Sequence, residues 1–543
     1  MSKTARTLAA AGFIIASAFP AFAQQKAQEP SKEQVQALIA QAMQQQSPSP
    51  ATGASAMLVQ PAGPTVNLTE AEAVARATDR NLTLISERIT PQTWDYTIAA
   101  TRAAYGFNLT SSLANNSANT PTSNVFEGGV RTTSNQQSWS AGIAKQMWWG
   151  GGNYSVNWTN SRNETSSTNS TCNPCFNSGL QASFTQPLLR NFRIDNTRAS
   201  ILTNEIGKDI AELNLTAQEV SILAQVRNAY WELVYARQAV EAAQQSLDLA
   251  TKQVADNRAR VEIGTMAPID VVQSQAEEAN RRQQLVNAQA TLRNNELALK
   301  RLIVSGTDDE LWRATIVPVD RPTVTAQPID LEAAVANALS SRIDLTTTVK
   351  NLESADIQLQ NLENLTKPQL DLVGSLNLAG RAGVSVPLKD PITGNLITPP
   401  AGGYFDALRS VGAFDSPTWN VRMQFSYPLG TSAQEANVAR QRLVRNQTEA
   451  SIKATQLQIA SEVTSAALAV RNSLEAMQAA TVARELAEQR HQAAQSKFDV
   501  GMATNFEVIQ AQRDLNDARN SELRQQLNYQ RALVDFQRVQ ITR

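Results

Sequence analysis

The stretch VEIGTMAPIDVVQSQ, residues 261–275, recurs as FDVGMATNFEVIQAQ, residues 498–512. Gly264 aligns with Gly501, and the match continues without gaps from about residue 218 to the end of the first copy. Self-similarity over so long a segment indicates a duplicated structural unit. The chain is therefore interpreted as two copies of one large unit.

The earlier parts of the two copies also correspond, but their offset changes along the chain. Residues 73–75 match residues 334–336, and residues 184–188 match residues 425–429 at a smaller offset. The first copy must therefore carry extra residues in its middle. We place the first repeat at residues 65–304, a linker with three prolines at 305–328, and the second repeat at 329–543.

Each unit is predicted to contain a long helical hairpin. Residues 198–262 contain no proline, and their apolar and small side chains recur at spacings of four and three residues, as in coiled coils. About 65 residues at a rise of 1.5 Å give a helix of roughly 100 Å, which no compact domain accommodates. The helix ends at Gly264 and a second helix returns over residues 268–302. The second copy repeats this at Gly501 and residues 505–539.

The other part of each unit is predicted to be β-structure. Apolar and polar side chains alternate there with period two, which fits strands with one apolar and one polar face. The predicted strands are residues 370–378 and 421–427 in the second copy and residues 107–113 and 180–186 in the first.

Two segments lie between these strands. In the first copy, an insert rich in tryptophan predicts an additional hairpin, residues 139–148 and 154–158, turned by Gly150, Gly151 and Gly152. In the second copy, residues 380–417 are rich in glycine and proline and are predicted to be a long loop.

The N-terminus predicts export. Lys3 and Arg6 precede an apolar run at residues 8–19, and a small-residue cleavage site follows at residues 21–23. The run is shorter than the ~20 residues that a membrane span needs. Residues 1–23 are therefore interpreted as a signal peptide rather than an anchor, and residues 24–64 as a flexible Gln/Ala/Pro-rich segment.

Alternating strands in an exported protein predict an outer-membrane barrel, with an apolar outer surface and a polar lumen. The smallest such barrels have about eight strands, and unpaired sheet edges are excluded from lipid. Four strands per chain could not close a barrel alone. If these strands enter a membrane, several chains must share one barrel.

Cys172 and Cys175 form a Cys-Asn-Pro-Cys motif in a stretch rich in Ser, Asn and Thr. A redox-active or metal-binding site competes with a small disulfide. Export favours oxidation, and the sequence offers no βαβ context and no further metal ligands nearby. We therefore regard the pair as a disulfide candidate whose loss should leave function largely intact.

The composition argues against an enzyme. The 543 residues carry a formal net charge of −1, with 48 basic and 49 acidic side chains, so no basic field exists to hold nucleic acid. The single histidine, His491, lies in an Ala/Gln-rich helical stretch and is interpreted as a helix-surface residue. No nucleophile–base pair, metal cluster or phosphate loop is evident, so we expect no catalytic site, cofactor or metal.

Four features in this order resemble the TolC-type outer-membrane efflux proteins. They are the repeat, QPLLRN at residues 186–191, ALSSRIDL at residues 338–345, and the paired tips at Gly264 and Gly501. The resemblance covers about residues 67–540. It implies an α+β membrane protein of two tandem repeats, each a β-hairpin plus a long α-helical hairpin. Three chains would form a 12-stranded β-barrel that continues into an α-helical periplasmic barrel, with a mixed α/β belt near the linker.

The resemblance also implies function and location. The protein would be the outer-membrane channel of a tripartite efflux pump or type I secretion system, a passive exit duct for small molecules or proteins. It would lie in the cell outer membrane and extend into the periplasm. The implied partners are two further copies in a homotrimer, a periplasmic adaptor (membrane fusion) protein, an inner-membrane transporter and outer-membrane lipid.

Two departures limit this resemblance. The family's Arg-Pro-Asp-Leu is Arg342-Ile343-Asp344-Leu345 here, which should alter one local turn. Family members can lock the closed entrance with an arginine that bonds an acid in the neighbouring hairpin. That position is Ala503, although the acid's equivalent, Asp270, is present, so the resemblance does not carry this lock over.

Asp270 and Glu507 occupy matching positions where the returning helices begin. Thr504 with Glu507 fits a capping box, and Pro268 at the first helical position puts Asp270 where an acid favours the helix dipole. Three-fold symmetry would also gather these acids into rings at a narrow entrance, and rings of like charge select cations. The family's second acidic ring falls at Gln510, so the ring should be weaker here.

The same tips are expected to dock the periplasmic adaptor. Gly264 and Gly501 fit left-handed helix caps at these tips. The alternative function is a periplasmic coiled-coil adaptor or scaffold protein without a membrane channel. Such a protein would have the helical hairpin but no alternating strands, so the strands favour the channel.

Overall fold

The computed structural model describes residues 64–122, 129–168, 170–321, 328–389, 393–397, 401–430 and 432–540. The predicted signal peptide, residues 1–23, and the flexible segment lie outside the described residues, except for Pro64. Every element below belongs to one unit, residues 63–543.

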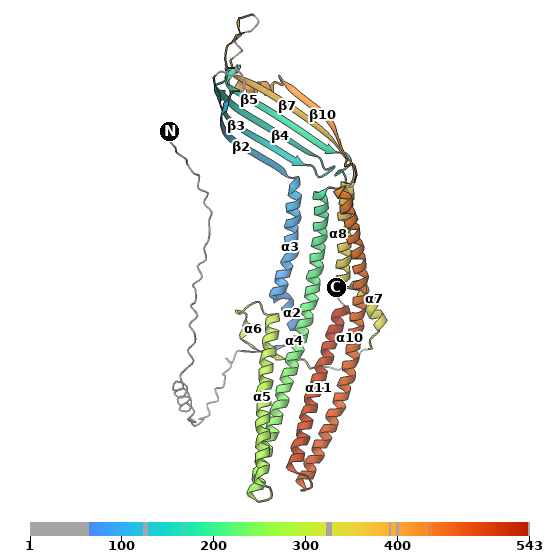
Figure 1. The fold of residues 1–543 in the computed structure, drawn as a ribbon. Helices are drawn as coiled ribbons and strands as arrows, with labels where there is room; N and C mark the ends of the chain where they lie inside the picture. Colours follow the sequence, from blue (N-terminus) through green and yellow to red (C-terminus); the bar gives the residue numbers. More distant parts are fainter. Residues whose placement is uncertain are drawn as a thin grey trace, which may run out of the picture. The chain divides into compact units, whose positions relative to one another are not determined.

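Two helical hairpins of equal size form the long part of this unit (Figure 1). Helix α4 (Asn196–Glu262) and helix α10 (Ala433–Asp499) each have 67 residues. Their returning partners, α5 (Pro268–Ile303) and α11 (Asn505–Gln540), each have 36. The predicted repeat of helical hairpins is confirmed, because a repeated sequence pattern imposes the same helix length twice.

Shorter helices pack beside the first part of each long helix. Helix α3 (Leu82–Arg102) lies along the start of α4, where the ring of Trp94 fills the space that a side chain at Gly207 would need: a Cβ there would lie 2.7 Å from the ring. Helix α8 (Ile343–Leu365) connects the second repeat with the first, since Lys350 pairs with Asp209 of α4 at 3.0 Å. The single glycine inside the first long helix is therefore a helix-packing site.

The predicted linker contains regular structure. Within it, helix α6 (Glu310–Arg313) precedes strand β6 (Thr315–Pro318), which pairs in parallel with β1 (Thr65–Leu68). Helices α2 (Glu70–Arg80) and α7 (Leu331–Ser341) lie in the same region (Figure 1). The fully buried Tyr230 of α4 donates a hydrogen bond to Asp320 at 2.8 Å, so this belt is anchored to the long helix.

Arg342 occupies the altered family motif. It precedes α8 and bonds Asp344 at 2.6 Å and Glu462 of α10 at 2.6 Å. Burial of Glu462 opposes its charge. Hydrogen bonds from Gln458 and Arg342, together with the positive charges of Arg342 and Arg538, outweigh burial and lower the pKa of this carboxyl below its ordinary value. Arg342 and Asp344 thus connect the start of α8 with α10 although isoleucine replaces the family's proline between them.

Six strands form one antiparallel sheet (Figure 1), so the prediction of four strands per chain is wrong. The predicted additional hairpin exists. It lies inside the sheet, between the two first-copy strands at residues 107–121 and 172–187, which a simple β-hairpin would have made neighbours. The order is β10-β7-β5-β4-β3-β2. The strands are β2 (Phe107–Pro121), β3 (Arg131–Gln146), β4 (Asn153–Thr165), β5 (Cys172–Pro187), β7 (Gln369–Ser385) and β10 (Pro417–Ser426).

The segment predicted as a long loop, residues 380–417, contains regular structure among its described residues. Strand β7 continues into it, and it contains the short strands β8 (Leu388–Lys389) and β9 (Leu396–Ile397) and helix α9 (Tyr404–Gly412). Ala407 and Val411 of α9 are buried against the sheet, and the carbonyl of Ala407 would lie 1.9 Å from a Cβ at Gly380. Gly380 therefore marks the point where a helix packs closely on a strand.

Cys172 and Cys175 are joined by a disulfide and are both buried. They lie at the start of β5, where its register with β7 shifts. The disulfide therefore closes an irregular strand end rather than a free loop.

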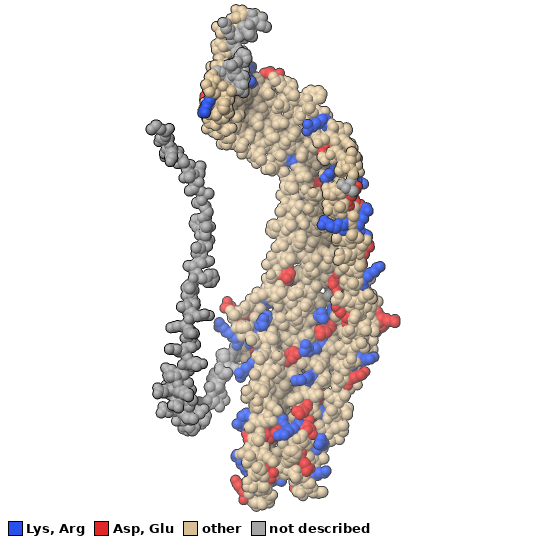
Figure 2. All heavy atoms as spheres, viewed as in Figure 1, with Lys and Arg blue, Asp and Glu red and all other residues tan. Residues whose placement is uncertain are grey.

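Charged side chains concentrate over the helices on the face shown in Figure 2, while few lie over the sheet. None of the described helices combines the length and apolarity that crossing a bilayer requires.

Candidate functional site

The two hairpin tips have the same backbone geometry. Gly264 has φ +78° and Gly501 has φ +76°, the left-handed conformation that glycine adopts without strain. The next amide in each tip bonds back to the helix: Thr265 to the carbonyl of Arg260 at 2.9 Å, and Met502 to that of Lys497 at 2.7 Å. Nothing lies within 4 Å of a Cβ at either glycine, so the turn, and not lack of space, requires glycine there.

Large apolar side chains project from both tips. Ile263 is 75% exposed and Met502 is 78% exposed in the single chain. Exposed clusters of this kind usually mark a protein contact. The other members are Ile269, Val272, Val500 and Phe506, all at least half exposed.

Asp270 and Glu507 lie in the first turns of α5 and α11, as predicted. The amide of Glu507 bonds the hydroxyl of Thr504 at 3.3 Å, and that hydroxyl also lies 3.3 Å from the Glu507 carboxylate. Thr504 thus caps the helix, but the carboxylate contacts the hydroxyl rather than the cap's backbone amide. Among the described residues the Asp270 and Glu507 carboxylates are not bonded to each other.

A buried polar cluster joins the two hairpins just behind the tips, and sequence reasoning missed it. Asn257 of α4 is 0% exposed, and its amide donates to Ser274 of α5 at 2.6 Å and to Asn505 of α11 at 3.0 Å. Asn505 also donates to the backbone carbonyl of Asp270 at 3.4 Å. The cluster therefore brings the starts of α5 and α11 together. The signal in the sequence was a lone asparagine in the buried seam of α4 after Val254, the kind of position that fixes coiled-coil register.

A charged cluster forms the second connection between the hairpins. The carboxylate of Glu277 lies 2.5 Å from Arg281 on the same helix and 2.6 Å from Arg513 on α11. Only 3% of the Glu277 and Arg281 side chains is exposed. The hydrogen bond from Arg513 to Glu277 raises the pKa of the Arg513 guanidinium. The spacing of Glu277 and Arg281 along one helix could be read from the sequence, but the contact of Glu277 with Arg513 in the other repeat could not.

Ala503 carries no charge, so it cannot supply the lock of the family. Near the tips, Arg260 of α4 lies 3.5 Å from Asp499 of α10. Together with the two clusters above, this pair connects the first hairpin with the second.

His491, on α10, is half-buried, and burial together with nearby Arg519 lowers its pKa.

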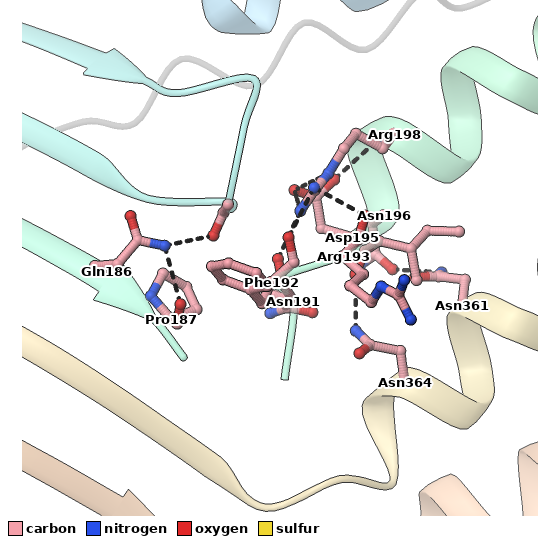
Figure 3. Close-up of polar contacts among 12 residues, drawn as sticks. Gln186, Pro187, Asn191, Phe192, Arg193, Asp195, Asn196, Arg198, Asn361 and Asn364 are labelled. Carbon is pink, nitrogen blue, oxygen red and sulfur yellow. Dashed lines mark hydrogen bonds and ion pairs between the residues drawn. The ribbon is translucent and has the colours of Figure 1, made fainter. Parts of the chain in front are cut away.

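The QPLLRN motif lies where the sheet passes into the helices (Figure 3). Gln186 donates a hydrogen bond to the carbonyl of Gly150 at 2.8 Å. The guanidinium of Arg198 bonds the carbonyls of Asn191 and Phe192 at 2.6 and 2.8 Å, and Asp195 caps α4. Asn191 has φ +65°. These bonds fix the compact turn through which the chain passes from β5 into α4.

Comparisons with known proteins agree with this architecture. The family model described as "Outer membrane efflux protein" matches residues 151–304 and 334–539, more than half of the chain. Comparison with curated protein sequences gave no significant match.

Several solved structures share the fold. The Campylobacter jejuni CmeC outer membrane channel is 16% identical with a TM-score of 0.62, over 87% of this chain and 85% of that one. The outer-membrane channel OprN is also 16% identical with a TM-score of 0.62, over 87% and 89%. The open state of the Neisseria gonorrhoeae MtrE outer membrane channel is 16% identical with a TM-score of 0.56, over 87% and 88%. The chain therefore belongs to the outer membrane efflux protein family and is an outer-membrane efflux channel that extends into the periplasm.

Proposed function

We propose that three copies of this chain form a passive exit duct that works with a periplasmic adaptor protein and an inner-membrane transporter. The observation that supports assembly best is the sheet. It has one apolar and one polar face, and every residue of its edge strands β2 and β10 is exposed in the single chain. Lipid does not tolerate unpaired strand edges, so both edges need partners, and further copies of the same sheet supply them.

The twelve-stranded barrel implied by the family resemblance required four strands from each of three chains. Each chain has six strands in its sheet. A barrel built from three whole sheets therefore does not contain twelve strands.

Assembly is tested with the full chain purified in detergent. Cross-linking should give trimers, and the protein should conduct ions when inserted into planar lipid bilayers. A protein that stays monodisperse without detergent and never conducts would instead support the periplasmic scaffold.

The entrance of the duct is proposed to lie at the hairpin tips, held closed by the contacts between the hairpins. The Asn257 and Glu277 clusters connect α4 and α5 with α11 within one chain, and they substitute for the lock that Ala503 cannot form. Widening the entrance requires these buried contacts to break or to move as a unit.

Glu507 should contribute to cation selectivity if three tips surround the entrance. Its side chain is exposed, so three copies of Glu507 would present a ring of negative charge to the solution. The variant Glu507→Gln should lower the cation-to-anion permeability ratio several-fold, measured from reversal potentials of single channels under a salt gradient. Glu475→Gln, an exposed acid farther along α10, is the matched control and should leave the ratio unchanged. Equal ratios in Glu507→Gln and the control would refute the ring.

Adaptor docking should depend on the apolar side chains of the tips. The double variant Ile263→Asp, Val500→Asp places charges on side chains that are exposed in the single chain, so folding should survive while adaptor binding weakens by tenfold or more. Binding is measured with immobilised channel and purified adaptor. Ile263→Leu, Val500→Leu preserves the apolar surface and should bind normally. Replacing Gly264 and Gly501 with valine should also weaken binding, by straining the turns. Undiminished binding by the aspartate variant would exclude docking at these tips.

A further inference from the structure

The β3–β4 hairpin is paired on both sides along most of its length. Strand β3 pairs with β2 from Lys145 opposite Phe107 to Arg131 opposite Pro121. Strand β4 pairs with β5 from Asn153 opposite Thr185 to Asn163 opposite Cys175. The hairpin therefore separates β2 from β5, which the four-stranded prediction had made neighbours.

The hairpin has the same two faces as the rest of the sheet. The cross-strand registers place one residue from each strand in a continuous row, and two successive rows across the sheet differ in polarity. One row is apolar across all six strands: Leu109, Ile143, Val156, Ala182, Leu376 and Trp419. The next row, on the opposite face, has no charged and no large apolar side chain: Thr110, Gly142, Asn157, Gln181, Asn377 and Thr418.

This continuity decides where the hairpin lies. In an insert that only covered the channel mouth, nothing would require apolar side chains in register with the apolar row of the other strands. Leu109 and Trp419, on the two edge strands, are each about three-quarters exposed in the single chain. An apolar band that crosses six strands is what the lipid face of a barrel requires.

The turn of the hairpin is built into the passage from sheet to helices (Figure 3). Gln186 of β5 donates to the carbonyl of Gly150, and a Cβ at Gly151 would lie 2.3 Å from the carbonyl oxygen of Asn191. Gly150 and Gly151 have φ +66° and +65°, so glycine permits both the turn and the close approach. The hairpin is thus fixed at its turn as well as along its strands.

The directions of the edge strands allow copies to join without a break in the pattern. Strand β2 follows α3 and runs away from the helices, whereas β10 runs toward them into α10 (Figure 1). Beside each other, β2 of one copy and β10 of the next are antiparallel, as are all neighbours within the sheet.

We propose that the β3–β4 hairpin is part of the membrane wall, and that β2 pairs with β10 of the next copy so that the trimer closes an 18-stranded barrel. The number follows from three sheets of six strands and rests on the trimer proposed above. Barrel diameter grows roughly in proportion to strand number, and barrels of about 16–18 strands enclose an aqueous channel. The outlet is therefore about half as wide again as a twelve-stranded one.

The inner lining of this outlet is mostly uncharged. Hydroxyl and amide side chains dominate the polar face of the sheet, and some bond across strands: Ser112 to Ser140 and Ser155 to Ser183, each at 2.8 Å. A wide lining of this kind suits bulky hydrophilic cargo without selecting strongly by charge.

Spin labels test the position of the hairpin in the full-length trimer in liposomes. Labels at Val156→Cys and Asn157→Cys report the two faces of β4, and labels at Val421→Cys and Asn420→Cys report the two faces of β10. The native cysteines are joined in their disulfide and do not take the label. Collision rates are measured with oxygen, which enriches in lipid, and with a water-soluble nickel chelate. The ratio of the oxygen collision rate to the nickel collision rate should be several-fold higher for labels at positions 156 and 421 than for labels at positions 157 and 420.

Each outcome separates this inference from the proposed function. Suppose that the two β10 labels differ in oxygen collision rate as expected, but both β4 labels collide mainly with the nickel chelate. The hairpin then lies outside the lipid, and the 18-stranded barrel is wrong. The proposed membrane channel is unaffected by this result. If the β10 labels do not alternate either, the proposed membrane channel itself is wrong. Electron cryo-microscopy of the same trimer should count 18 strands, and a count of 12 would overturn the inference.

Discussion

Replacing Glu277 with alanine should lower the free energy of unfolding by about 3 kcal/mol or more. Arg281, 3% exposed, would then keep its buried charge without the carboxylate 2.5 Å away, and Arg513 would lose its partner on the other repeat. Removing one member of a buried ion pair costs more than the pair itself contributes, because the remaining charge stays desolvated. The loss is measured as the shift of the urea midpoint of the helical circular dichroism signal.

Two further variants show whether this mechanism is correct. Arg513 is 44% exposed at its side chain, so Arg513→Gln should cost clearly less than Glu277→Ala. The double variant Glu277→Leu, Arg281→Met removes both buried charges and should recover much of the lost stability. If Glu277→Ala is no less stable than Arg513→Gln, the cluster does not hold the hairpins together. A recovered double variant should also show a more readily opened channel, since the Glu277–Arg513 contact between α5 and α11 would be gone.

Replacing Gly151 with valine should abolish most of the assembled trimer. A Cβ at this position would lie 2.3 Å from the carbonyl oxygen of Asn191, and φ +65° is strained for a β-branched residue. Strain and overlap together should cost several kcal/mol. The β3–β4 turn could then not pack against the residues before α4, and the hairpin would lose its attachment at the helix side of the sheet. The amount of trimer in outer-membrane extracts, read on semi-native gels, measures the effect.

Gly129 offers a matched control for this prediction. It also has a positive φ, +79°, but nothing lies within 4 Å of a Cβ there. Gly129→Val should therefore retain most of the trimer, because it introduces backbone strain without a collision. Equal trimer yields from the two variants would mean that the turn is not packed against Asn191, which would weaken the case for an integral hairpin.

Local patterns predicted the helices well because helix formation depends on residues that are close together in the sequence. The absence of proline, the four-three spacing and the glycine at position 264 predicted a helix over residues 198–262, and α4 spans Asn196–Glu262. The positions of Asp270 and Glu507 in the first helical turns followed in the same way. Their proposed role at an entrance is not local, and it stays a prediction.

Strand neighbours were harder to predict. Alternation identified the hairpin around Gly150–Gly152 but said nothing of where it would pair, since register is decided by strands far apart in the sequence. The prediction of a loop after β7 failed for a related reason. Gly380 looked like a loop residue, yet it is the point where α9 packs on the sheet.

By itself, the sequence determined the duplication, the two long helical hairpins with their glycine tips, and the two-faced character of the strands. These depend on periodicity and on backbone preferences of single residues, which act over a few neighbours. Only the tertiary structure decided that six strands form one sheet, that Glu277 meets Arg513 across the repeats, and that Asn257 joins three helices at the tips. Those features depend on contacts between residues as far as 248 positions apart in the sequence, which no local pattern specifies.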